Sequence, residues 1–146
     1  MNLMIVIDER CAMQFNGRRQ SRDCELIRRI LERADGKRLW ICPNSVELFD
    51  GIESSNIAVS PTAPEAAGKG EFCFMESPPL SGALPRIERF FVYRWNRKYP
   101  GDVFPDLRPW ETEGWELVNS CEFAGYSHEQ ITEEIYIRTD KNTGEN

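Results

Sequence analysis

The feature of this sequence that most constrains its fold is the alternation of short apolar runs with segments of helical periodicity. Residues 3–7 form an unbroken apolar run, which is typical of a strand buried on both faces within a parallel sheet. After a loop with a turn signal at Asn16 and Gly17, apolar residues recur at helical spacing in residues 26–34. Strands that alternate with helices in this way predict βαβ units and a mainly parallel sheet.

The rest of the chain continues this pattern until its C-terminal part. Further strands are predicted at residues 38–42, 56–60, 72–75 and 90–95, with short helices at residues 43–49 and 79–86. Residues 61–70 lack an apolar period and predict a loop, whereas residues 115–123 and 131–138 alternate as an antiparallel pair does. We therefore expect an α/β domain over residues 1–138, with three layers (α/β/α) around a mixed, mostly parallel sheet. Residues 139–146 are predicted to be a disordered tail.

The first predicted helix begins with residue types that are common at a helix N-terminus. Ser21 is expected as the N-cap, and Asp23 and Glu25 follow in the first turn, where the helix dipole favours carboxylates. Glu25 also stands at i,i+4 to Arg29, the spacing of a favourable ion pair. Basic residues here are interleaved with acidic ones, so we expect a solvated helix face.

Charge and cysteine content exclude several classes of function. The chain has 18 Lys and Arg against 24 Asp and Glu, and a net charge of -6 argues against a nucleic-acid partner. Its 5 cysteines are scattered and it has a single histidine, His128, so neither a disulfide framework nor a metal site is predicted. No apolar stretch reaches membrane-spanning length and no signal segment is recognised. We expect a cytoplasmic protein without a membrane partner.

Residues 84–138 resemble the C-terminal part of dihydrofolate reductase. The resemblance is carried by Leu84-Pro85-Arg86 before a strand, Gly101-Asp102 followed by Phe104-Pro105, Trp115 opening the next strand, and Ile135-Tyr136-Ile137-Arg138 closing the last. Residues 4–7 and 56–60 agree more faintly, so the resemblance covers nearly the whole chain at low identity. It implies the dihydrofolate reductase fold, NADPH as cofactor, and a pterin-like ligand gripped by a helix carboxylate.

The resemblance also implies where the ligands of such a protein would lie. On the pterin side it implicates the apolar residues Ile5, Val6, Leu26, Ile27 and Ile30. On the cofactor side it implicates the family positions Asn44, Ser45, Met75, Glu76 and Ser77.

This sequence departs from the family motifs at those cofactor positions. The family's Gly-Arg falls at Cys42-Pro43-Asn44, where the glycine and the arginine are absent and Pro43 lacks an amide donor. The family's Gly-Gly falls at Glu76-Ser77, which puts a negative charge where a pyrophosphate should approach. The NADPH site is therefore predicted to be degenerate.

Candidate catalytic groups follow from the same alignment. The family carboxylate falls on Leu26, and Asp23 is the nearest acid on the same helix face, so it is the candidate acid; the competing interpretation is a carboxylate that only stabilises the helix dipole. Tyr93 falls where the family has a threonine and could place a hydroxyl in the pocket, or be an ordinary aromatic strand residue. His128, in Ser127-His128-Glu129-Gln130, is expected to be an inert surface histidine in the turn before the last strand, with no Ser or Cys beside it in a recognisable triad order.

Three functions stay open at this point. The leading hypothesis is a binding or regulatory domain that keeps the scaffold without NADPH-dependent activity. The second is an active NADPH-dependent reductase of dihydrofolate or another pteridine, with a rearranged site. The third is a protein-interaction module, for which the anchor candidates are Trp95, Tyr99, Trp110 and Trp115. The sequence does not specify the ligand, the partner or the oligomeric state, nor whether side chains such as Trp40 fill the cleft.

Overall fold

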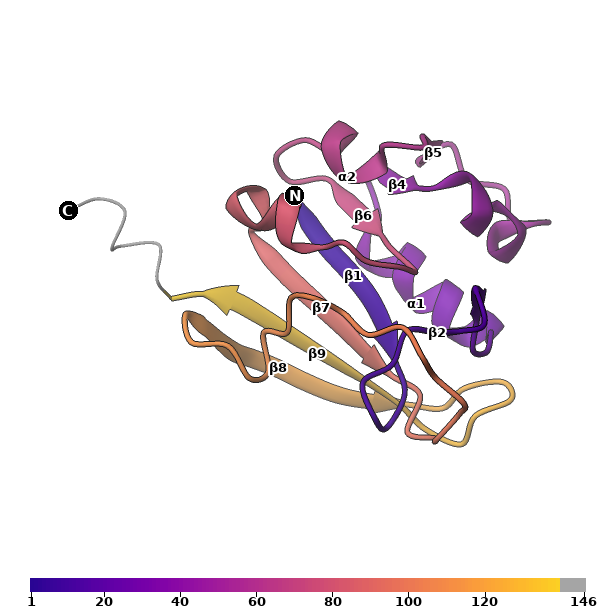
Figure 1. The fold of residues 1–146 in the computed structure, drawn as a ribbon. Helices are drawn as coiled ribbons and strands as arrows, with labels where there is room; N and C mark the ends of the chain where they lie inside the picture. Colours follow the sequence, from indigo (N-terminus) through magenta and orange to yellow (C-terminus); the bar gives the residue numbers. More distant parts are fainter. Residues whose placement is uncertain (140–146) are drawn as a thin grey trace.

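The computed structural model describes residues 1–139, in which a seven-stranded sheet organises the chain (Figure 1). The strand order across it is β5-β4-β6-β1-β7-β9-β8. The strands are β1 (Asn2–Ile7), β4 (Leu39–Ile41), β5 (Ile57–Val59), β6 (Phe72–Phe74), β7 (Arg89–Arg94), β8 (Trp115–Phe123) and β9 (Ile131–Arg138). All pairs among β5, β4, β6, β1 and β7 are parallel, and only β9 runs against its neighbours β7 and β8. The sheet is therefore mixed and mostly parallel, as predicted.

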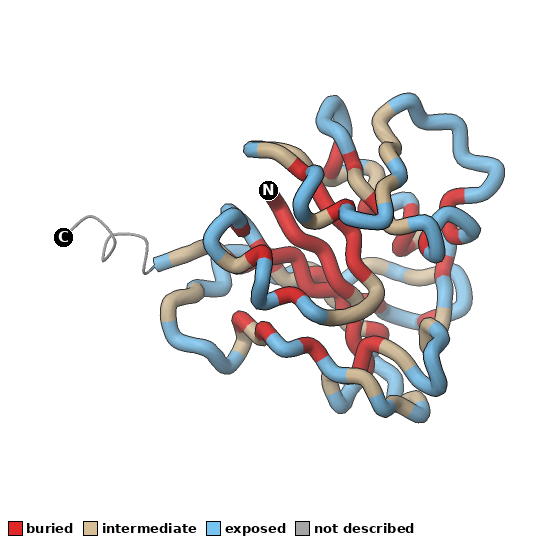
Figure 2. The backbone as a smooth tube through the Cα atoms, turned by 45° about the horizontal axis from the view of Figure 1, so that its top comes forward, coloured by how far each residue is buried: buried red, intermediate tan, exposed pale blue. Residues whose placement is uncertain are grey.

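Two apolar clusters cover the opposite faces of this sheet. Alternate residues of β1 divide between them: Leu3 and Ile5 belong to one cluster and Met4 to the other. Helix α1 (Cys24–Arg33) and the 3₁₀ helix η1 (Pro43–Phe49) pack on the Met4 face. Helix α2 (Ala63–Ala66) and the 3₁₀ helix η2 (Ser81–Arg86) pack on the Leu3 face. The central strands are buried along most of their length (Figure 2), which gives the predicted α/β/α layers.

The predicted elements are present, with local differences. A short hairpin, β2 (Gln14–Phe15) and β3 (Arg18–Arg19), occupies the region predicted to be only a loop. Its strands are too short to show an apolar period in the sequence. The predicted loop at residues 61–70 contains α2. Of the tail predicted at 139–146, residues 140–146 lie outside the described residues.

Helix α1 begins differently from the sequence prediction. Asp23, not Ser21, is the N-cap: its carboxylate accepts a hydrogen bond from the Glu25 N–H at 2.9 Å. Glu25 pairs with Arg28 at 3.4 Å instead of Arg29, because Arg29 turns toward the sheet. The predicted stripe is correct, and Leu26, Ile27 and Ile30 are buried beneath the helix.

Strands β1 and β6 are neighbours whose following segments leave toward opposite faces. The chain after β1 leads to α1 on one face, whereas the chain after β6 leads to η2 on the other. In open α/β sheets, ligands bind beyond the carboxyl ends of strands at such a switch point. The topology therefore predicts a ligand site beyond Ile7 and Phe74, the carboxyl ends of β1 and β6.

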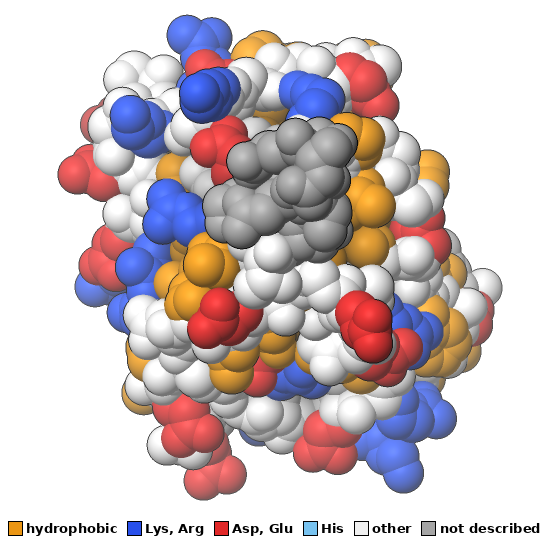
Figure 3. All heavy atoms as spheres, turned by 90° about the vertical axis from the view of Figure 1, so that its left-hand side faces the viewer, with side chains coloured by type: hydrophobic (Ala, Val, Ile, Leu, Met, Phe, Trp, Pro, Cys, Tyr) orange, Lys and Arg blue, Asp and Glu red, His pale blue; other side chains and the backbone are white. Residues whose placement is uncertain are grey.

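In the described part of the chain, no helix combines the length and the apolar character that a membrane crossing requires. On the face seen in Figure 3, basic and acidic side chains are interspersed.

Candidate functional site

A small apolar cavity lies at the switch point between β1 and β6. It has a volume of about 30 Å³, which is close to the space that a single water molecule takes up. Its apolar walls come from β1, α1, η1, β6 and the residue after β7: Val6, Leu26, Ile27, Leu48, Phe74, Met75 and Trp95. The segment after β1 closes its mouth with Arg19, Gln20 and Ser21.

An ion pair between Arg19 and Glu76 lies at the mouth of this cavity, and we call it the gate. Arg19 Nε lies 2.7 Å from Glu76 Oε1 and Nη2 lies 2.8 Å from Oε2, which is a bidentate contact. Arg19 also donates to the backbone oxygen of Asn44 at 2.7 Å and pairs with Glu47. Ser45 donates its hydroxyl to Glu76 at 3.2 Å. The hydrogen bonds that Arg19 donates to Glu76 are the main reason that the pKa of Arg19 is raised.

The gate separates the cavity from an open groove on its other side. This groove has a volume of about 410 Å³ and is lined by Gln14, Gly17, Arg18, Arg19, Asn44, Glu47 and Glu76. Arg19 and Glu76 line both spaces. Movement of Arg19 away from Glu76 would therefore join the apolar cavity to solvent.

The hairpin that carries Arg19 is anchored by the Gly101-Asp102 motif. Asp102 donates its N–H to the Gln14 oxygen at 3.0 Å and accepts from the Asn16 N–H at 3.2 Å. A Cβ atom on Gly101 would lie 2.4 Å from the Ala12 Cβ, so only glycine allows this close packing. The family-like motif thus has a structural role here: it fixes the loop that holds the gate.

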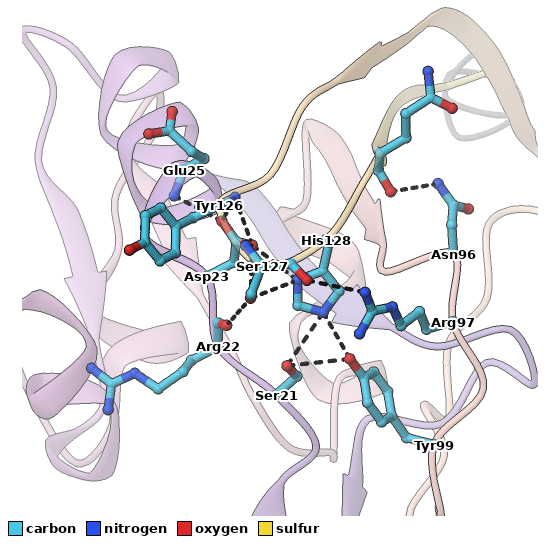
Figure 4. A network of polar contacts seen from close by, with 11 residues as sticks. Ser21, Arg22, Asp23, Glu25, Asn96, Arg97, Tyr99, Tyr126, Ser127 and His128 are labelled. Atoms are coloured by element: carbon cyan, nitrogen blue, oxygen red, sulfur yellow. Dashed lines mark hydrogen bonds and ion pairs between the residues drawn. The ribbon is translucent and has the colours of Figure 1, made fainter.

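Asp23 lies at the centre of a buried polar network beside the cavity (Figure 4). Besides capping α1, it accepts from the N–H groups of Tyr126 and Ser127, at 2.9 and 2.8 Å, and from His128 Nδ1 at 2.9 Å. Burial alone would raise the pKa of Asp23, but these hydrogen bonds outweigh burial and hold its pKa well below the usual range. Asp23 is therefore a carboxylate that joins the β8–β9 loop to α1.

His128 is buried in this network and is not a surface residue, so the sequence expectation for it was wrong. It is 3% exposed, and its ring stacks on Trp95 with centroids 4.4 Å apart. Nε2 lies 2.8 Å from the Tyr99 hydroxyl and 3.3 Å from Ser21 Oγ. The neighbouring Ser127 lies 3.2 Å from Nδ1, whereas Ser21, which contacts Nε2, is far from His128 in the sequence, so no local motif revealed the Ser21 contact.

A second buried cluster surrounds Glu133 on β9. Glu133 is 1% exposed and accepts hydrogen bonds from Arg29, Arg33 and Tyr93, the last at 2.7 Å. Burial would raise the pKa of Glu133, but the two guanidinium groups and the Tyr93 hydroxyl outweigh it and lower the pKa to about 2. The cluster joins α1 to the antiparallel part of the sheet.

The structure brings together only part of the predicted pterin side. Val6, Leu26, Ile27 and the candidate acid Asp23 line the cavity. Ile5 and Ile30 are fully buried in opposite clusters and are absent from the cavity lining. Tyr93 is 0% exposed, and its hydroxyl is bound to Glu133 instead of facing the cavity.

The residues predicted for the cofactor side also lie only partly at this site. Met75 and Glu76 line the cavity, Asn44 lines the groove, and Ser45 contacts Glu76. Ser77 lines neither space. Arg19 and Glu133 were not predicted as site residues, because their partners are distant in the chain. The cluster of arginines around residues 18–29 was the one signal near Arg19.

The four proposed interaction anchors are not exposed aromatic residues. Trp95 is 4% exposed, and Tyr99, Trp110 and Trp115 are partly buried against the two clusters. The exposed aromatic side chains among the described residues are instead Phe15, Phe104 and Tyr126. In residues 1–139 there is also no group of three or more His, Cys, Asp or Glu that could hold a metal ion.

Comparison with known proteins identifies the architecture. A structure of dihydrofolate reductase from Enterococcus faecalis, complexed with NADP(H) and RAB-propyl, superposes with a TM-score of 0.66 and covers 95% of this chain and 96% of that chain. This chain has the dihydrofolate reductase fold. The sequence identity is 13%, which shows the fold alone. No protein-family model and no curated protein matches the sequence.

Proposed function

We propose that this protein is a dihydrofolate reductase-like binding or regulatory domain that does not carry out NADPH-dependent hydride transfer. The observation that carries the proposal is the gate. Glu76 stands where the resemblance expects glycine beside the cofactor pyrophosphate, and its side chain is 8% exposed. Phosphate oxygens brought to this position would meet a carboxylate that already has its own cation, Arg19.

The other residues of the expected cofactor site also do not fit NADPH. Pro43 removes an amide donor at the start of η1, and the Asn44 carbonyl beside it already accepts from Arg19. Arg19 itself is neutralised by Glu76 and Glu47. A cavity of about 30 Å³ is far smaller than the roughly 300–1,000 Å³ of ordinary ligand pockets. We therefore derive no reaction step through NADPH.

The geometry supports a small ligand that enters through the opened gate. The cavity walls are mainly apolar, and two acceptors at the mouth would need donors: Glu76 once Arg19 leaves it, and Gln20 Oε1. Gln20 donates its amide N–H groups to Asp8 and Pro100, which leaves Oε1 buried and without a hydrogen-bond partner within residues 1–139. With Arg19 moved away, the cavity would join the groove of about 410 Å³, and this joined space would suit a pterin-sized molecule with a cationic or N–H donor edge.

Thermal unfolding with added ligands tests the proposal. A ligand at 100 times its dissociation constant stabilises a protein by about 2.7 kcal/mol, which is several degrees for a chain of this size. We expect no shift with NADPH or NADP. We expect a shift with a simple pterin such as biopterin, and a larger one in Arg19→Ala, where no side chain competes for Glu76.

The matched control is Arg18→Ala, which removes the exposed arginine next to Arg19 on the same hairpin. It should respond to the pterin as the wild type does. A shift with NADPH in the wild-type protein would contradict the absence of cofactor binding. Equal responses of Arg19→Ala and Arg18→Ala would contradict the role of the gate.

A further inference from the structure

Ser21, His128 and Asp23 are aligned in the order of a nucleophile, a base and an orienting acid (Figure 4). Ser21 Oγ lies 3.3 Å from His128 Nε2, and His128 Nδ1 lies 2.9 Å from Asp23 Oδ2. This is the pairing of contacts that activates a serine in unrelated hydrolases, where geometry rather than sequence order defines the site.

The hydrogen bonds determine which imidazole nitrogen can act as a base. The Asp23 carboxylate only accepts, so Nδ1 carries the hydrogen and donates it to Asp23. In the neutral imidazole, Nε2 is then left as the acceptor that faces Ser21 and Tyr99. The ring stacks on Trp95, which holds it in this orientation. Gly125 leaves room for the Asp23 carboxylate, because a Cβ at that position would lie 2.8 Å from Asp23 Oδ2.

Ser21 is placed to meet a ligand and has no capping role. Asp23 caps α1, so the Ser21 hydroxyl is not needed at the helix terminus. Ser21 lines the apolar cavity, next to Arg19 and Gln20. The Tyr99 hydroxyl lies 2.8 Å from His128 Nε2 and 3.4 Å from Ser21 Oγ, so its single hydrogen must turn away from Nε2 to donate to an oxyanion formed at Ser21.

We propose that Ser21 is an activated nucleophile that reacts with small acyl esters, with His128 as general base and Asp23 as the residue that positions it. Ser21 Oγ forms a bond to the ester carbonyl carbon while its proton passes to His128 Nε2. The C–O bond to the alcohol then breaks, and the alcohol leaves with that proton. Water, deprotonated by the same nitrogen, attacks the acyl group and releases a carboxylic acid and free Ser21.

The cavity limits the substrate class. Its walls are mainly apolar and its volume is about 30 Å³, so we expect only the shortest uncharged acyl groups, such as acetyl, and only after Arg19 moves to enlarge the space. Entry requires the gate to open, because Arg19 and Glu76 border the cavity. This inference goes beyond the proposed binding function and does not depend on whether a pterin or NADPH binds.

Labelling with a small alkyl fluorophosphonate, followed by peptide mass spectrometry, tests the inference. We expect a single adduct on Ser21, its loss in Ser21→Ala, and labelling about 100-fold slower in His128→Gln, in keeping with the usual contribution of a general base. Arg19→Ala should be labelled faster than the wild type. Ser120→Ala, which changes an exposed serine on β8, should be labelled as the wild type is.

Two further controls keep the test decisive. Ser21→Ala removes one hydroxyl from a partly exposed residue, so it should fold, and circular dichroism checks this for each variant. Hydrolysis of p-nitrophenyl acetate should follow the same order of variants. The inference is overturned by an absence of adduct in both the wild type and Arg19→Ala, by an adduct on another residue, or by an unchanged rate in a folded His128→Gln protein.

Discussion

Asp23 illustrates how one side chain can satisfy several structural needs at once. It caps α1, holds the β8–β9 loop through two backbone N–H groups, and orients His128. The oxygen atoms of Asp23 therefore already accept hydrogen bonds. The sequence left two interpretations of Asp23 open, a catalytic acid or a carboxylate that stabilises the helix, and these contacts support the second. Its assignment as an acid toward a pterin stays a prediction.

We predict that Asp23→Asn destabilises the protein by about 2 kcal/mol, because the amide NH₂ would face N–H donors where an oxygen now accepts. Urea unfolding monitored by fluorescence measures this change. Glu25→Gln, in the same helical turn, is the matched control and should change the free energy of unfolding by less than about 0.5 kcal/mol. Equal effects of the two substitutions would contradict the role given to Asp23.

Glu133 is the most buried acidic side chain that pairs with arginine among the described residues. Glu133→Gln would leave Arg29 and Arg33 without their common anion, so we expect a loss of about 3 kcal/mol in the free energy of unfolding. Glu129→Gln, at an exposed position, should leave the free energy of unfolding nearly unchanged. A Glu133→Gln protein as stable as the wild type would show that the cluster does not hold α1 to β9.

The low pKa of Glu133 also predicts how stability depends on pH. The folded protein holds this pKa at about 2, below the ordinary 4.5, so the folded state binds fewer protons than the unfolded state between these values. Stability from this group is fully present above pH 4.5 and is lost as the pH falls toward 2. Urea midpoints measured over this range should fall less steeply in Glu133→Gln than in the wild type.

Among the secondary structure elements, the β2–β3 hairpin depends most on contacts from elsewhere in the chain. Its strands are short, and Gly101 and Asp102 hold it against the loop that precedes it. Gly101→Ala should displace the hairpin, because the new Cβ would overlap Ala12. Hydrogen exchange should show faster exchange at Asn16 and in the hairpin, while β1 stays protected; unchanged protection of the hairpin would contradict this anchoring.

The sequence predicted the elements better than the contacts between them. Apolar runs and helical periodicity located the main strands, α1, η1 and η2, because these patterns reflect burial on one or two faces. The hairpin carries no such pattern, and the exact N-cap was missed because both Ser21 and Asp23 suit that position. The gate and the His128 network join residues that only the folded chain brings together, so no local spacing reveals them.

The whole molecule has the dihydrofolate reductase fold at 13% identity to the enzyme from Enterococcus faecalis. Many sequences can satisfy the same alternation of buried strands and amphipathic helices, so a fold can persist while its binding groups change. Here the carboxylate of Glu76 and the guanidinium of Arg19 occupy the mouth of the cleft. The fold was therefore predictable from the sequence, whereas the ion pair between Arg19 and Glu76 was not.

The decisive measurement is the rate of NADPH oxidation in the presence of dihydrofolate, with an active dihydrofolate reductase as positive control. We predict no oxidation above the rate without protein, for the wild type and for Arg19→Ala alike, because opening the gate leaves the Glu76 carboxylate in place. Oxidation that rises in proportion to the wild-type protein concentration would contradict this prediction and identify the chain as a working reductase.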